Sequence, residues 1–416
     1  MGCCDVNGLM PLSIALEKMQ SSLSNVCNAI TLPLSEALGF TLSENIVSTL
    51  NVPAFNNSAM DGYAVKAKDL IACSDSNPIT LNMVGKSFAG APYHGDEIGS
   101  GCCIRIMTGA VVPNSLDCVV MQERVDAEGD LITFKHAPQA YNNVRFAGED
   151  LKVGQQVLLQ GHKLTPRDIP LLASLGIASV NVYRKLKVAV LSSGDELRNL
   201  GESLSVGEIY DTNRYSIIAL LSRLNVEVID FGIIRDDYLL IKEAMNKADQ
   251  QADVVITSGG VSVGEADFIK EVLNEIGEIG FWKLAIKPGK PFAFGKLQNS
   301  VFFGLPGNPV SAIVTLYQLA VPAMAKMSGE LAKPALRFNA ISKDKLSKSP
   351  GRTDFQRGIY SVNEQGELVV STTGNQGSGV FSSMSLSNCF IVLEEERGHI
   401  NAGETVMIEP FSPLMD

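Results

Sequence analysis

The segment at residues 253–267 restricts the fold more than any other part of this 416-residue sequence. A β-branched run at residues 254–256 predicts a short buried strand. Gly259 and Gly260 then allow a tight turn and a close approach of the backbone to a ligand. Apolar residues at helical spacing follow from position 268, so a helix is expected there. This order favours anion binding, because free backbone N–H groups and the helix dipole point at the anion.

Two carboxylates, Glu265 and Asp267, lie at the expected start of this helix. Beside an anion site they suggest a bridging metal ion, whereas the alternative is that they only stabilise the first helical turn. The segment alone leaves both interpretations open. Residues 260–264 also match the G-x-S-x-G pattern of a hydrolase nucleophile, with Ser262 as the serine. A catalytic triad would then need a later histidine, and His399 alone follows in the sequence.

From residue 186 onward, strand-like and helix-like segments alternate, which predicts a mostly parallel sheet. Ligands of such sheets bind at the carboxyl ends of the strands. Three of the expected strands end beside an acidic pair: Asp195 with Glu196, Asp236 with Asp237, and Glu265 with Asp267. Oxygen ligands of this kind suit Mg²⁺, which also binds substrate phosphates. For any single pair, solvated surface acids remain the alternative.

A basic segment balances these acids. Residues 281–296 contain no acid and four lysines, namely Lys283, Lys287, Lys290 and Lys296. In a chain with a net charge of −11 this favours binding of phosphate or another oxyanion. The alternative is a solvated hairpin, formed by residues 281–286 and 291–294, whose lysines protect a sheet edge.

Other regions are β-rich. Residues 79–134 alternate with a period of two, and strands joined by glycine-rich turns follow residue 334, which predicts a small barrel or sandwich there. Between the strand at 301–303 and the next helix, Asn308 as N-cap and Pro309 at the first helical position explain a turn structurally. From the residues alone, the polar loop at 54–64 is a solvated connection and Thr108 caps a glycine turn.

Composition excludes several classes. With 45% hydrophobic and 19% charged residues the chain is typical of a globular protein, and its acidity argues against nucleic-acid binding. The longest apolar candidate, residues 312–324, is too short to cross a bilayer, so no membrane association is expected. No C-x-x-C motif occurs, which disfavours structural zinc and favours reduced thiols in the cytoplasm.

Eight motifs in sequence order resemble the family of molybdopterin molybdenumtransferases, which are related to the C-terminal part of gephyrin. They cover nearly the whole chain, and their number and order are far more specific than any one of them. They lie at residues 58–64 (Ser-Ala-Met-Asp-Gly-Tyr-Ala), 105–110 (Arg-Ile-Met-Thr-Gly-Ala), 148–150 (Gly-Glu-Asp), 193–196 (Ser-Gly-Asp-Glu), 210–213 (Tyr-Asp-Thr-Asn), 259–267 (Gly-Gly-Val-Ser-Val-Gly-Glu-Ala-Asp), 287–291 (Lys-Pro-Gly-Lys-Pro) and 304–311 (Gly-Leu-Pro-Gly-Asn-Pro-Val-Ser).

The resemblance implies a multidomain α/β fold with four domains. It implies a small helical and extended N-terminal domain (residues 1–53 and 152–184) and a β-rich inserted domain (54–151). A central three-layer α/β domain that binds molybdopterin, with a mostly parallel sheet (185–333), and a C-terminal β-barrel-like domain (334–416) complete it. The implied reaction inserts molybdenum from molybdate into adenylylated molybdopterin with Mg²⁺ and releases AMP.

The resemblance also implies roles for particular residues. Catalytic carboxylates that handle Mg²⁺ would be Glu196, Asp236 and Asp267. Catalytic residues from the inserted domain of the partner subunit would be Asp61, Thr108 and Asp150, which overturns the solvated interpretation of the 54–64 loop. Substrate-binding residues would be Gly259, Gly260, Ser262, Lys283, Lys287, Lys290, Pro306, Pro309, Ser311, Arg352 and Ser378. The chain lacks the arginine that some members place just after residue 378.

The expected assembly is a cytoplasmic homodimer whose active site is shared between subunits. Further partners implied are the molybdopterin adenylyltransferase and apo-forms of molybdoenzymes or their chaperones. Two alternatives compete with molybdenum insertion. One is adenylylation of molybdopterin, which the motifs at 58–64 and 105–110 disfavour. The other is a gephyrin-like scaffold that binds a receptor peptide.

Overall fold

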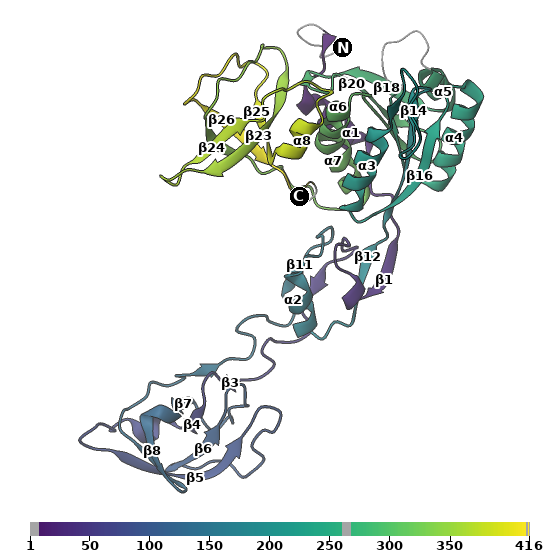
Figure 1. Cartoon of the computed structure of the whole chain (residues 1–416). Coiled ribbons are helices and arrows are strands. Elements are labelled where there is room, and N and C mark those ends of the chain that lie inside the picture. Colours follow the sequence, from purple (N-terminus) through teal and green to yellow (C-terminus); the bar gives the residue numbers. More distant parts are fainter. Residues whose placement is uncertain (1–7, 260–267, 413–414, 416) are drawn as a thin grey trace.

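In the computed structural model, which describes residues 8–259, 268–412 and 415, the α/β domain is built on a six-stranded sheet (Figure 1). The strands follow the spatial order β16 (Val226–Ile234), β13 (Leu186–Ser193), β17 (Val254–Ser258), β21 (Val301–Leu305), β20 (Pro291–Lys296) and β18 (Glu278–Lys283). The first four are mutually parallel, β20 runs antiparallel to β21, and β18 runs antiparallel to β20. Every residue of β17 and β21 is buried, as in strands covered on both faces.

Helices cover both faces of this sheet, which makes the three layers. Val188 and Val190 of β13 face one cluster, whereas Ala189 and Leu191 face the other, as the two-residue period of a strand requires. The first face packs against α1 (Leu12–Ser22), α3 (Thr212–Ser222), α6 (Pro309–Thr315) and α7 (Val321–Met327). The second face packs against α4 (Tyr238–Gln251) and α5 (Phe268–Ile276).

A π-helical turn, η5 (Leu316–Ala320), joins α6 to α7 into one apolar helix. By length and composition, the segment from Pro309 to Met327 is sufficient to cross a membrane, so the apolar helix is longer than the sequence run at 312–324 suggests. However, 72% of the apolar window lies buried inside the structure. It is therefore placed as the core helix of the α/β domain.

The C-terminal domain is a closed barrel. Closure follows because β23 pairs with both β24 and β25, while β22 and β26 complete the ring. One more strand, β19 (Ile286–Lys287), comes from the α/β domain and adds to β23. The barrel elements are β22 (Phe338–Ser342), β23 (Thr353–Val362), β24 (Leu368–Thr372), α8 (Ser382–Leu386), β25 (Cys389–Leu393) and β26 (Thr405–Pro410).

The lysine-rich hairpin differs in part from its expected form. β18 and β20 do form an antiparallel pair, in register from Glu278 opposite Lys296 to Lys283 opposite Pro291. The connection between them is not a plain solvated loop, because Ile286 and Lys287 leave this sheet and pair with the barrel.

Two further parts complete the chain. The elongated N-terminal domain joins residues before and after the insertion in one apolar cluster that includes Leu42, Ile46, Leu164 and Val182. Its elements are β1 (Ala29–Pro33), η2 (Leu34–Glu36), β2 (Ile46–Val47), β11 (Gln156–Leu158), α2 (Asp168–Ser174) and β12 (Ser179–Tyr183). Beside the α/β sheet, a short pair forms from β14 (Leu197–Arg198) and β15 (Ile209–Tyr210).

The inserted domain holds a second six-stranded sheet, in the order β7-β4-β6-β5-β9-β8. Figure 1 shows this domain at the end of the molecule opposite to the α/β domain and the barrel, with the N-terminal domain between them. The elements of the inserted domain are β3 (Asn57–Ser58), β4 (Gly62–Val65), η3 (Ala67–Leu70), β5 (Ile79–Ser87), β6 (Cys102–Ile106), β7 (Cys118–Met121), η4 (Gln122–Arg124), β8 (Val125–Glu128), β9 (Leu131–Phe134) and β10 (Val144–Arg145).

The predicted fold class is confirmed, while the domain boundaries remain predictions.

An ion pair fixes the junction between the N-terminal domain and the α/β domain. Arg184 follows β12, and its guanidinium contacts both carboxylate oxygens of Asp253 at 2.8 and 2.9 Å. The backbone N–H of Lys187 donates to the same carboxylate at 2.8 Å. Burial opposes ionisation of Asp253, but these hydrogen bonds outweigh it and hold the pKa of the carboxyl below its usual value.

We expect Asp253→Asn to lower the free energy of unfolding by about 2 kcal/mol at pH 7, because charged hydrogen bonds of this kind are lost. A lowered folded-state pKa stabilises above about pH 4, and the benefit is lost as the pH falls through that pKa. The variant should therefore lose part of the acid dependence of stability. Urea unfolding between pH 2 and pH 7 measures both effects. Glu275→Gln, which removes a surface pair with Lys242, is the control and should change little.

Candidate active site

The carboxyl ends of β16, β13, β17 and β21 lie side by side at one edge of the sheet, because these neighbouring strands are parallel. Glu196 follows β13 and Asp236 follows β16, so the structure brings these two predicted carboxylates to the same edge. Gly259 follows β17 there. The predictions for Gly260, Ser262 and Asp267, and the choice between Glu265 and Asp267, fall on residues outside those described.

Hydrogen bonds tie the ends of β13 and β16 together. The hydroxyl of Ser193 donates to Asp236 Oδ1, and the backbone N–H of Asp236 donates to Asp195 Oδ1 at 3.2 Å. The neighbouring Asp237 instead caps α4, accepting from the N–H groups of Leu239 and Leu240 at 2.9 and 3.0 Å. Both acids are exposed, but their hydrogen bonds differ, because Asp237 caps a helix whereas Asp236 accepts from Ser193 at the sheet edge.

Glu196 is exposed on the loop after β13, and this loop is held in place by a backbone bond from Ile209 N–H to Glu196 O at 2.8 Å. Its carboxylate folds back over Gly194, where an added Cβ would lie 2.6 Å from Glu196 Oε2. The glycine therefore leaves room for this carboxylate next to the strand end.

Asn213 connects the two loops that follow β17 and β21. Its amide donates to Ser258 Oγ and to the carbonyl oxygen of Gly307, both at 2.7 Å. Its Oδ1 is buried and has no hydrogen-bond partner among the described residues. Asp211, which precedes Asn213 in the motif at 210–213, caps α3, because its side chain accepts from Arg214 N–H. We did not predict the role of Asn213, although the motif at 210–213 pointed to it.

The turn between β21 and α6 lies beside Gly259. Gly259 adopts a φ of +89°, and its N–H donates to Leu305 O at 3.2 Å. Pro306 is buried and Pro309 occupies the first turn of α6 as expected. Asn308 occupies the N-cap position as predicted, but its side chain makes no capping hydrogen bond. Instead, Pro309 presets the backbone of the first turn.

The C-terminal domain also reaches this turn. The N–H of Val310 donates to Ser378 O at 3.1 Å, which brings the segment at 374–378 against the start of α6. Ser311 is buried in the same helix. In the barrel, Arg357 is buried and holds this segment through the carbonyl oxygens of Asn375 and Gly377.

The predicted lysines lie on the connection between β18 and β20. Lys283 and Lys290 are exposed, and their backbones are fixed by hydrogen bonds from Met10 N–H to Lys283 O and from Leu284 N–H to Lys290 O. Lys287 is half-exposed and forms an ion pair with Asp354 of the barrel, with 3.2 Å between Lys287 Nζ and Asp354 Oδ2. Arg352, at the start of β23, is partly exposed.

The other predicted catalytic residues lie elsewhere. In the inserted domain, Asp61 Oδ1 accepts from the backbone N–H and the hydroxyl of Thr108, both at 2.7 Å. These two hydrogen bonds, the backbone one first, lower the pKa of the Asp61 carboxyl. Asp150 is exposed, and its backbone N–H donates to Val52 O at 3.0 Å. Figure 1 shows the inserted domain far from the sheet edge of the same chain.

A metal ion would need oxygen ligands at the sheet edge. Glu196 and Asp236 supply exposed carboxylates from adjacent strand ends, and Mg²⁺ is commonly held by one or two carboxylates together with substrate phosphates. Within the described residues, no group of three acids, histidines or cysteines lies close enough to hold a metal alone. The donor set therefore fits Mg²⁺ that is bound jointly with a phosphate ligand.

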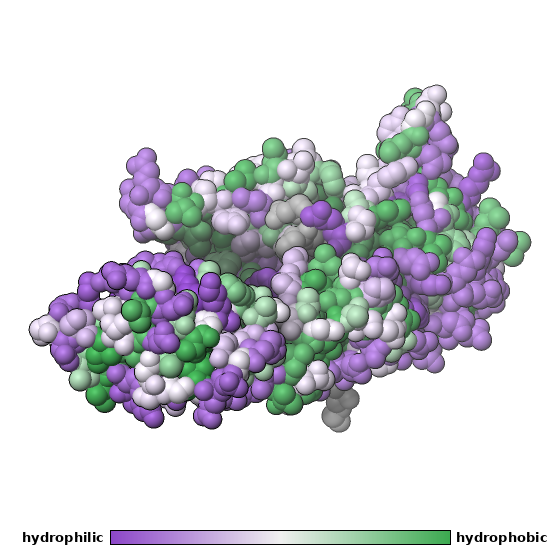
Figure 2. All heavy atoms as spheres, turned by 90° about the horizontal axis from the view of Figure 1, so that it is seen from below, coloured by the Kyte–Doolittle hydropathy of each residue, from purple (hydrophilic) through white to green (hydrophobic). Residues whose placement is uncertain are grey.

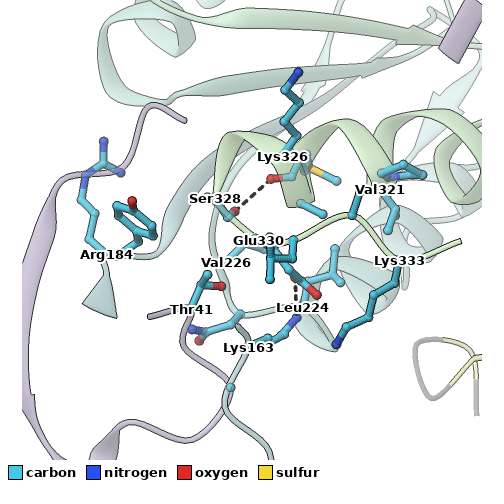
Figure 3. Close-up of a pocket in the computed structure, with 18 of the residues that line it drawn as sticks. Thr41, Lys163, Arg184, Leu224, Val226, Val321, Lys326, Ser328, Glu330 and Lys333 are labelled. Carbon is cyan, nitrogen blue, oxygen red and sulfur yellow. Dashed lines mark hydrogen bonds and ion pairs between the residues drawn. The ribbon is translucent and has the colours of Figure 1, made fainter. Parts of the chain in front are cut away.

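A cavity of about 480 Å³ lies outside this edge, where the N-terminal domain meets the α/β domain (Figure 3). An ion pair between Lys163 and Glu330, 3.4 Å apart, forms part of its wall. None of the described site residues lines it. The site that the sequence predicts is therefore at the strand ends and is separate from this cavity.

Comparisons with known proteins agree with this organisation. Three family models match consecutive parts of the chain, namely the MoeA N-terminal region (domain I and II) at residues 10–176, a probable molybdopterin binding domain at 189–326, and the MoeA C-terminal region (domain IV) at 339–411. The fold and the strand-end site thus define a multidomain protein built around an α/β domain of the molybdopterin-binding class.

Relatives cover the whole length. The molybdopterin molybdenumtransferase of Haemophilus influenzae is 53% identical over 409 residues, which are 98% of this chain and 100% of the relative. That of a Nostoc species is 33% identical over 89% of this chain and 86% of its own. A crystal structure of the molybdopterin biosynthesis moeA protein from Pyrococcus horikoshii has 31% identity and a TM-score of 0.85, and covers 97% of this chain and 100% of that one. The chain belongs to the molybdopterin molybdenumtransferase (MoeA) family, which confirms the resemblance seen in the motifs.

We expect Thr108→Val to raise the pKa of Asp61, because the variant removes the hydroxyl donor but keeps the shape of the side chain. The rise should be partial, since the backbone N–H of residue 108 still donates. Carbon-13 NMR titration of labelled aspartate carboxyls measures the change. Thr80→Val is a matched control, because that hydroxyl pairs with Thr133 in the same domain, 2.9 Å away. An unchanged or lower pKa of Asp61 would contradict the assigned hydrogen bonds.

Proposed function

We propose that this chain inserts molybdenum from molybdate into adenylylated molybdopterin, forming molybdenum cofactor and releasing AMP. The observation that carries the proposal is the meeting of two carboxylates, Glu196 and Asp236, with the glycine turn at Gly259 at one edge of a parallel sheet. The family membership supplies the substrates, because relatives that match over the whole chain carry the name molybdopterin molybdenumtransferase.

The carboxylates and the glycine turn would handle the adenylate. Glu196 and Asp236, together with Asp267, would hold Mg²⁺, which would neutralise charge on the phosphates as the bond to AMP breaks. Gly259 offers close backbone approach to a phosphate, and Asn213 keeps the loops after β17 and β21 at a fixed spacing. Ser193 and Asp195 orient Asp236, so that its carboxylate need not reorganise when the ligand binds.

The lysines would hold the oxyanion. Lys283, Lys287 and Lys290 share one connection, and Ser378 and Arg352 come from the barrel beside it. A fixed set of cations would keep molybdate next to the dithiolene of the pterin, so that transfer of the metal is a matter of positioning. Pro306 and Pro309 stiffen the turn that the segment at 374–378 contacts.

We further propose that the site is completed by a second subunit of a homodimer. Asp61, Thr108 and Asp150 lie in a domain that is remote from the sheet edge of its own chain (Figure 1). Next to Glu196, a segment at residues 200–215 exposes several large apolar side chains, which is typical of an interface: Leu200, Leu204, Val206, Ile209, Tyr210 and Tyr215. Figure 2 shows one face of the molecule, on which hydrophilic and apolar areas are interspersed. The Mg²⁺ requirement and a cytoplasmic location are part of this proposal.

The test of the function is a reconstituted reaction of the full chain with adenylylated molybdopterin, molybdate and Mg²⁺. AMP and active cofactor should form together. Asp267→Asn should block the release of AMP while the adenylylated substrate still binds, because only the carboxylate charge is lost. Chromatography of AMP and equilibrium binding of the substrate measure the two steps. Unimpaired turnover in this variant would refute the assignment of Asp267.

The shared site is tested by complementation between two inactive variants. Asp61→Asn and Asp236→Asn should each lose activity as homodimers. In a mixed dimer, one site would carry both defects and the other would be intact, so random mixing should restore about a quarter of the wild-type activity. Two variants from the same domain, Glu196→Gln and Asp236→Asn, are the control and should not complement each other. No recovery in the first mixture would mean that each site lies within a single chain.

A further inference from the structure

Lys287 belongs to two domains at once. It follows β18 of the α/β sheet in sequence, but its backbone pairs with the barrel strand β23, where Lys287 lies opposite Asp354. The pairing is fixed by a hydrogen bond from Thr353 N–H to Ala285 O at 2.9 Å. The barrel therefore determines where the ammonium of this lysine lies, although the two residues are 67 positions apart in the chain.

Asp354 is an unusual partner for a lysine of a binding site. Its side chain is 5% exposed, whereas that of Lys287 is 44% exposed. The same oxygen, Asp354 Oδ2, accepts from Gln356 Nε2 at 3.0 Å, and Gln356 is itself buried and bound to Ser347 O. Gln356 thus holds the buried carboxylate in place, while the ammonium of Lys287 remains accessible to solvent.

Another cation lies near this carboxylate but does not replace Lys287. Lys348 is buried, and mainly because of burial its pKa is lowered. Its Nζ donates to the carbonyl oxygens of Ser349 and Glu395, at 3.3 and 3.2 Å. In the described part of the chain, Lys287 is the one cation within ion-pair distance of Asp354.

We propose that Asp354 is a positioning residue that holds the Lys287 ammonium and competes with the oxyanion for it. The inference rests on the proposed function in one respect, since it takes Lys287 as an oxyanion ligand. A buried carboxylate 3.2 Å from the ammonium fixes its direction and occupies part of the charge that an approaching dianion would otherwise bind. Molybdate therefore binds more weakly than it would without the charge of Asp354, but the Lys287 ammonium that contacts it has one fixed position.

The experiment compares molybdate binding to the full chain in a double-mutant cycle of Asp354→Asn and Lys287→Gln. Asp354→Asn alone should lower the Kd for molybdate by about fivefold, the size of a partly exposed charge pair. In the Lys287→Gln background the same change should have much less effect, because the competing ammonium is gone. In the reconstituted reaction, Asp354→Asn should also lower kcat, since the lysine loses its fixed direction.

Glu409→Gln is the matched control, because it removes another buried carboxylate of the barrel, which pairs with Arg337 at 2.9 Å. It should leave the Kd for molybdate unchanged. If Asp354→Asn does not fold, as judged by thermal unfolding, Asp354→Ser replaces it, with the same tighter binding expected.

An unchanged or higher Kd in a folded Asp354 variant, or an equal effect with and without Lys287, would overturn the inference. Failure of the proposed function has a different signature. In that case wild-type protein would release no AMP, while the binding cycle would still report on Lys287 and Asp354.

Discussion

Burial of the central strands on both faces is the constraint on which the rest of the α/β domain depends. β17 and β21 are buried along their entire length and contain no charged side chain, because a charge there would lie in the apolar core. Polar groups can therefore gather only where the strands end. Because the strands are parallel, their carboxyl ends lie at one edge of the sheet. The acids, the glycine turn and the side chains that position them by hydrogen bonds are all found there.

This edge could be predicted from sequence because its signals are local. A β-branched run, a glycine and an acid follow one another within a few residues, and the strand–helix alternation indicates parallel order. The contacts that position the site residues could not be predicted, because they join residues that are far apart in the sequence. Asn213 contacts Ser258 across 45 positions, and Lys287 contacts Asp354 across 67. The predicted hairpin pairing does form, but periodicity does not reveal that β19, in its connection, pairs with the barrel.

Pairs of neighbouring acids show how a fold separates structural from functional carboxylates. The sequence gives Asp236 and Asp237 the same character, and either residue suits the start of a helix. The structure separates them by hydrogen bonds, because Asp237 accepts from two N–H groups of α4 while Asp236 is held by groups of the β13 loop. A carboxylate that already accepts from the N–H groups of a helix end is less available to a ligand, so Asp236 is the better candidate of the two.

The inserted domain extends this reasoning to the whole molecule. Thr108 holds the carboxylate of Asp61 through two hydrogen bonds, which lower the pKa of this carboxyl. An ionised carboxylate of this kind is suited to binding a ligand. However, the α/β domain with its acids and lysines lies at the opposite end of the molecule (Figure 1). The Arg184–Asp253 ion pair and the apolar cluster of the N-terminal domain oppose large rearrangement between them. This separation within one chain is the reason for our proposal that a neighbouring subunit brings Asp61 to the sheet edge.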